Sequence, residues 1–171
     1  MSILIYAESA EGKIKKVAFE LASYAKKVAS SMGTTVTAVT INNADNSALA
    51  TYGVDKVVTV SNDKLNNFSA KAYADVIAQV AKKEGAQIVL VSSSTDSLYV
   101  APLVAVALEA GYASNVVALP ESTSPFQVKR TAFSNKAFNL TEINTPVKVL
   151  GIAKNSFGLI ENASSLTEES F

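Results

Sequence analysis

The chain has 171 residues, 49% of them apolar, which is enough for a single domain with a real hydrophobic core. Its 15 basic residues balance its 15 acidic residues, which argues against nucleic acid or an anionic membrane as the main partner. Cysteine and histidine are both absent, which excludes disulfides, thiolate chemistry and histidine acid–base catalysis and argues against a zinc site.

The first part of the chain alternates short apolar runs with helical patterns. Apolar residues recur at helical spacing from Ile14 to Met32, and Gly33 follows as a typical helix-ending glycine. The opening apolar run is too short for a signal peptide, and no run reaches the ~18 residues of a membrane span. We therefore expect a cytoplasmic protein without membrane insertion. The pattern predicts strands at residues 3–7, 36–41, 56–60, 88–91 and 116–119, helices at 14–32, 70–81 and 98–110, and a short helical segment at 47–52.

This alternation predicts an α/β fold of three layers, α/β/α, with a mostly parallel, Rossmann-like sheet covered on both faces. The pattern changes after residue 119. Residues 126–133 and 137–143 flank a short turn and predict a C-terminal antiparallel hairpin, and a last strand is expected at 147–153. We expect one domain at residues 1–154, and a polar tail or the start of a linker at 155–171.

The most informative stretch is residues 87–111, which reads as strand, turn and helix. The turn, Ser92–Ser97, holds small hydroxyl or acidic side chains that suit a helix N-terminus and are not expected in the core. The helix after it is apolar on nearly every side, so more than one side should be covered. Part of this helix, or the hairpin near Phe126 and Phe133, is therefore expected to dock on a partner, unless Val100, Leu103, Val104 and Ala107 are all buried within the chain.

Ligand sites of parallel sheets lie at the carboxyl ends of the strands, where this chain places Glu8, Ser9, Ser94 and Thr95. A phosphate or ribose would suit this position beside the N-terminus of a helix, although capping and turn formation are the favoured roles. Neither glycine-rich phosphate-loop motif occurs. Glu8 and Glu11 are expected to lie on a solvated loop, no serine has a histidine to activate it, and no catalytic or metal-binding residue is predicted.

Four segments taken together resemble the N-terminal domain of the electron transfer flavoprotein α subunit. They are residues 5–13 (IYAESAEGK), 52–57 (YGVDKV), the unit at 92–111 with Ala101-Pro102-Leu103, and 128–137 (VKRTAFSNKA). The resemblance spans nearly the whole chain and implies an adenine-nucleotide α-hydrolase-like fold. The family's glycine and basic residues near the long helix are replaced by Ser97, Leu98 and Leu103, and the hairpin glycine by Asn135, which tolerates positive φ.

The resemblance also implies a function, that of a subunit of a soluble electron carrier and not of an enzyme. Such a carrier takes electrons from dehydrogenases and passes them to a quinone oxidoreductase or similar acceptor. FAD is expected in a C-terminal domain missing from this chain and AMP in the β subunit, so this chain would hold no cofactor and would be a redox-inert scaffold that docks the β subunit. Arg130 matches a family arginine and is an interface or near-cofactor candidate, or else an ordinary surface arginine. The alternative is a stand-alone adenine-nucleotide-binding module that uses the Glu8–Ser9 and Ser92–Ser97 turns.

Overall fold

The computed structural model describes residues 2–171 and has the predicted α/β architecture. One long mixed sheet runs in the order β10-β9-β7-β11-β6-β1-β4-β5-β12, with β8 paired to β9. Every pair from β7 to β12 in this order is parallel, and the pairs that involve β9 are antiparallel. The long strands are β1 (Ser2–Tyr6), β4 (Thr35–Ile41), β5 (Lys56–Val60), β6 (Ala86–Ser92), β7 (Gly111–Val116), β9 (Phe126–Ala132), β10 (Ala137–Glu142), β11 (Lys148–Ile152) and β12 (Thr167–Ser170).

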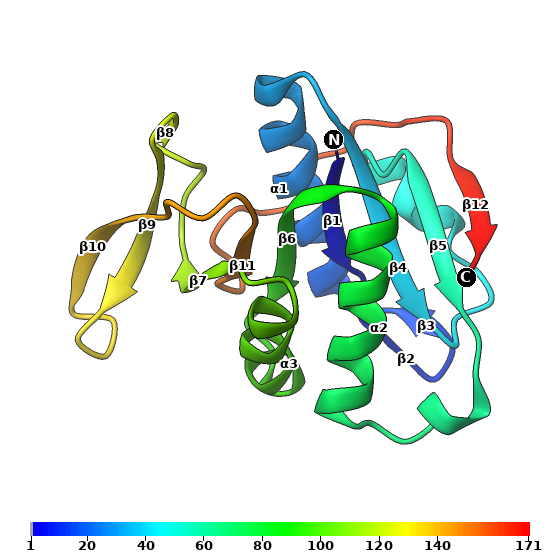
Figure 1. Ribbon diagram of the computed structural model, residues 1–171. Coiled ribbons are helices and arrows are strands. Elements are labelled where there is room, and N and C mark those ends of the chain that lie inside the picture. The colour runs from blue at the N-terminus through cyan, green and yellow to red at the C-terminus, as the bar shows by residue number, and fades with distance from the viewer. Residues whose placement is uncertain (1) are drawn as a thin grey trace.

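The helices form the two outer layers. α1 (Lys16–Met32) covers one face of the sheet, and α2 (Ala70–Lys83) and α3 (Thr95–Ala107) cover the other face (Figure 1). Gly33 ends α1 in the left-handed conformation (φ 63°), as its position predicts. Among the described residues no helix is long and apolar enough to cross a membrane. The short elements are η1 (Ser47–Tyr52), η2 (Asp63–Leu65), β2 (Ser9–Ala10), β3 (Lys13–Ile14) and β8 (Ser122–Thr123).

Two hydrophobic cores lie on opposite faces of the sheet, and β1 contributes to both. Ile3 and Ile5 are buried in the core beneath α1, whereas Leu4 and Tyr6 are buried in the core beneath α2 and α3. Alternate side chains of a strand point to opposite faces, so a strand buried on both faces is apolar throughout. The prediction of three layers is confirmed, because a sheet that is buried on both faces needs helices on both sides.

The prediction of a strand at residues 116–119 is wrong. The strand here is β7, Gly111–Val116, and the chain leaves the sheet after Val116. Only Ala113 and Val116 of β7 are buried, so its small and polar residues hide the strand from a search for apolar runs. α3 also ends at Ala107, before the predicted boundary, which gives the chain room to enter the sheet at Gly111.

Residues 155–171 run along the body of the domain, in orange and red in Figure 1. The buried carboxylate of Glu20 on α1 accepts N–H bonds from Asn155 and Phe157 at 2.9 Å and from Gly158 at 3.2 Å. The segment then ends in β12, which pairs in parallel with β5 at the edge of the sheet. The division of the chain at residue 154 stays a prediction.

Candidate functional site

The candidate site lies where β1 and β6 meet at their carboxyl ends. The chain leaves β1 through α1 toward β4 and β5, and leaves β6 through α3 toward β7, on the opposite face and the opposite side of the sheet. This is the topological switch point, at which open α/β sheets bind ligands. Glu8 follows β1 here, and the turn Ser92–Ser97 joins β6 to α3.

The Glu8 carboxylate occupies the centre of this position and is only 2% exposed. Its Oε1 accepts hydroxyl bonds from Ser92, from Ser94 at 2.7 Å and from Ser97 at 2.8 Å. Its Oε2 accepts a bond from Lys15 Nζ at 3.2 Å. We call these five residues the Glu8 cluster. The expectation that Glu8 lies on a solvated loop is therefore wrong, because the turn after β6 closes over it.

Burial acts to raise the pKa of Glu8, but the bonds from Ser92, Ser94 and Ser97 and the charge of Lys15 outweigh it, and the net pKa lies below its ordinary value. Glu8 is therefore an anion at neutral pH. The three hydroxyl groups and the lysine satisfy that charge within the chain, so the cluster is a closed unit.

The same turn caps α3. Ser94 Oγ accepts from the Ser97 N–H at 3.1 Å, and Ser92 Oγ accepts from the Ser94 N–H at 3.2 Å. The positive end of a helix dipole attracts an anion, and here the anion is the side chain of Glu8. The expectation that Ser92 and Ser97 lie outside the core is wrong, since Ser92 is 2% and Ser97 0% exposed. These hydroxyls and this helix end are thus already used, and they do not fit a nucleotide or a flavin pyrophosphate.

The structure brings together only part of the predicted set. Glu8 and Ser94 are in direct contact, whereas Ser9 donates to the Ile41 carbonyl at 3.4 Å and Thr95 is exposed at the start of α3. Arg130 lies on β9, beyond β7, β11 and β6 from Glu8, and donates to Ser114 Oγ at 3.2 Å. No local pattern in the sequence points to Lys15 or to the roles of Ser92 and Ser97. A glutamate directly after one buried strand, and hydroxyls spaced along the turn after another, are the signal for such a cluster.

The architecture defines an open α/β domain whose switch point is filled by its own carboxylate. The family model described as the electron transfer flavoprotein domain matches residues 3–169, so the chain belongs to this family and corresponds to the N-terminal domain of its α subunit.

Curated relatives agree with this family membership. The chain is 32% identical over 120 residues to the electron transfer flavoprotein subunit alpha of Thermoanaerobacterium thermosaccharolyticum, a match covering 68% of this chain and 36% of that protein. It is 25% identical over 165 residues to the Bacillus subtilis subunit alpha, covering 95% and 50%. It is 28% identical over 148 residues to the lactate dehydrogenase (NAD(+),ferredoxin) subunit LctC of Acetobacterium woodii, covering 84% and 35%. The chain thus spans between a third and a half of the length of these relatives.

Proposed function

We propose that this domain is a redox-inert scaffold that docks the β subunit of an electron transfer flavoprotein, a FAD-dependent electron carrier. The family match and the names of the curated relatives support this role. The relatives extend well beyond the matched segment, which supports an FAD site outside a domain of this kind in an electron carrier of this family. AMP would belong to the β subunit.

The closed Glu8 cluster is the observation that carries the scaffold role. The position that would receive a ligand in an open α/β sheet instead joins β1 to α3 through Glu8. The same closure counts against a stand-alone adenine-nucleotide module at the Glu8–Ser9 and Ser92–Ser97 turns. Electron donors among dehydrogenases, a quinone oxidoreductase as acceptor, the cytoplasmic location and a domain ending at residue 154 stay predictions.

Exposed apolar side chains on α3 support the docking role. Val100 and Val104 are buried beneath the helix, but Leu103, Tyr99 and Val106 are 41%, 64% and 79% exposed. The rest of the chain therefore covers only one side of α3. The exposed side is still a reason to expect a partner on this helix. Contiguous exposed apolar surface of this kind is typical of a protein interface.

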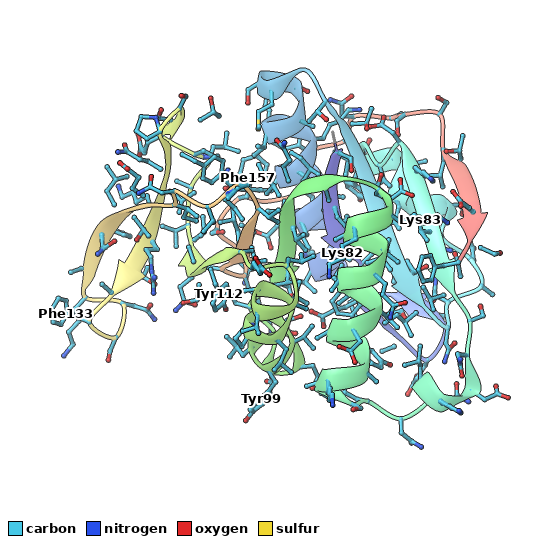
Figure 2. All side chains as sticks on the ribbon, in the orientation of Figure 1. Lys82, Lys83, Tyr99, Tyr112, Phe133 and Phe157 are labelled. Atoms are coloured by element: carbon cyan, nitrogen blue, oxygen red, sulfur yellow. The ribbon has the colours of Figure 1, made fainter. Side chains whose placement is uncertain are left out.

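The hairpin β9–β10 carries a second exposed apolar group. Phe138 and Leu140 share one face of the edge strand β10, and Phe133 lies at the tip of the hairpin, 84% exposed. Figure 2 shows Phe133 projecting from the hairpin and Tyr99 projecting from the start of α3. An edge strand with free backbone groups and apolar side chains is a docking surface unless it is covered.

The test is co-expression with an electron transfer flavoprotein β subunit, followed by size-exclusion chromatography read at protein and flavin wavelengths. We expect the two chains to co-migrate without flavin absorbance from this domain. Val106→Glu and Phe138→Glu should each reduce co-migration, because a carboxylate would be buried in the interface. Leu159→Glu, at a similarly exposed apolar residue outside both surfaces, is the control. Unchanged co-migration in both variants would contradict docking through these surfaces, and tightly bound flavin in the isolated chain would contradict the redox-inert role.

A further inference from the structure

A second concave site lies at the carboxyl ends of β6, β11 and β7, on the side of β6 away from β1, with the hairpin β9–β10 as one wall. Its volume is about 620 Å³, within the range of small-molecule pockets. It shares no residue with the Glu8 cluster. Its main lining residues are Ser93, Asn115, Val117, Lys129, Phe138 and Lys154.

The charged side chains that line this cleft are all positive. Lys129 and Lys154 line it, and no carboxylate does. Neither lysine forms an ion pair with any residue from 2 to 171. Lys129 Nζ lies 4.6 Å from the centroid of the Phe138 ring, which holds the ammonium group at the cleft wall while its N–H donors stay available. Two lysines that form no ion pair, in a cleft that no carboxylate of the described residues lines, favour an anionic occupant.

Hydrogen-bond donors converge on the same cleft. Asn115, Asn135 and Asn155 all line it, with left-handed backbone at φ 55°, 64° and 58°. Asn115 lies in β7, where its register with β11 shifts, and the other two lie at turns. Ser93 also lines it, and its Oγ is buried without a hydrogen-bond partner among the described residues. A buried hydroxyl without a partner costs free energy, which a ligand oxygen would offset. Turns held by a rigid sheet are a common setting for binding sites.

We propose that this cleft binds a phosphate ester. A phosphate group supplies up to two negative charges and several acceptor oxygens, which match the two lysines and the amide and hydroxyl donors. The organic part of the ester would lie against Phe138 and Val117, which form the apolar portion of the wall. The proposal concerns a site separate from the switch point. The cleft shares Phe138 with the proposed docking surface on β10, but binding is tested on the isolated chain and does not depend on docking of the β subunit.

The test is a titration of the ¹⁵N-labelled chain with phenyl phosphate at low ionic strength, followed by NMR. We expect saturable shifts of the amides of Asn115, Asn155 and Ser156. Lys129→Gln and Lys154→Gln should each weaken binding at least tenfold. Lys82→Gln, at an exposed lysine of α2 that does not line the cleft, should leave the affinity unchanged. Inorganic phosphate, which lacks the ring, should bind more weakly than phenyl phosphate.

Four results would overturn the proposal. They are the absence of saturable shifts, equal weakening by Lys82→Gln, shifts confined to Ser92–Ser97, and equal affinity for inorganic phosphate, which would indicate an adventitious ion only. If phenyl phosphate fails to bind but Lys129→Gln abolishes co-migration with the β subunit, the cleft holds an acidic protein segment instead. Co-migration is measured separately, so failure of this proposal and failure of the docking role are distinguishable.

Discussion

Ser97 Oγ donates a hydrogen bond to Glu8 Oε1 at 2.8 Å across 89 positions of sequence. This bond ties the N-terminal turn of α3 to the end of β1, and Ser92 and Ser94 donate to the same oxygen. One carboxylate thus holds together the central strand pair and the helix that packs beside it. The consequences for stability are measurable.

Glu8→Gln should lower the free energy of unfolding by about 1.5–3 kcal/mol, the range for hydrogen bonds to a charged group. The substitution removes the negative charge to which the three serine hydroxyls and Lys15 donate hydrogen bonds. Urea denaturation followed by circular dichroism measures the change. Glu11→Gln, at an exposed position of the neighbouring turn, is the matched control and should change the stability little. Equal effects of the two substitutions would show that the Glu8 cluster contributes no special stability.

The contribution of Glu8 should also depend on pH. Its folded-state pKa lies below the ordinary value of 4.5, so the unfolded chain takes up this proton first as the pH falls. The stabilisation is therefore fully present above about pH 4.5 and is lost as the pH falls through the folded-state pKa. The difference in urea midpoint between the wild type and Glu8→Gln should be largest at neutral pH and shrink below pH 4. A difference that stays constant from pH 7 to pH 3 would contradict this assignment.

Glu20→Gln should loosen the segment that follows β11. The Glu20 carboxylate accepts the backbone N–H bonds of Asn155, Phe157 and Gly158, and an amide offers a weaker, uncharged acceptor. We expect faster hydrogen exchange at these three amides, with exchange in β1 unchanged. Glu161→Gln, an exposed residue of the same segment, should leave the exchange rates as they are. Unchanged protection in Glu20→Gln would mean that other contacts hold the segment.

Gly111→Ala should destabilise the domain by about 1–3 kcal/mol through overpacking. A Cβ at Gly111 would lie 2.5 Å from Ile143 Cγ2 and 2.9 Å from Thr145 Oγ1, closer than real contacts allow. Gly151→Ala is the control on the adjacent strand β11, because its Cβ would meet its nearest neighbours at 3.4 Å and 3.5 Å. Thermal denaturation should rank Gly111→Ala clearly below Gly151→Ala, and the reverse order would be inconsistent with this close contact.

Local patterns predicted most of the elements. β5 has the predicted bounds, α1 ends before Gly33, and the hairpin β9–β10 forms around the predicted turn. Short-range periodicity and turn chemistry depend on residues that are neighbours in the sequence. A single strand or helix can therefore be predicted without knowledge of the rest of the fold. The prediction places β7 too late in the chain and contains no strand at β12. Few side chains of these two strands are buried, and their pairing with strands distant in the sequence defines them.

The sequence by itself determined the alternation of strands and helices, the parallel three-layer sheet and the family, because these depend on local periodicity and on the order of short motifs. Only the tertiary structure decided that Glu8 is buried, because its partners Ser92, Ser94 and Ser97 follow more than 80 positions later. The same is true of the proposed phosphate cleft, whose residues come from separate strands and turns. The role of a charged group or hydrogen-bond donor depends on the residues that surround it in space, and only the tertiary structure brings those residues together.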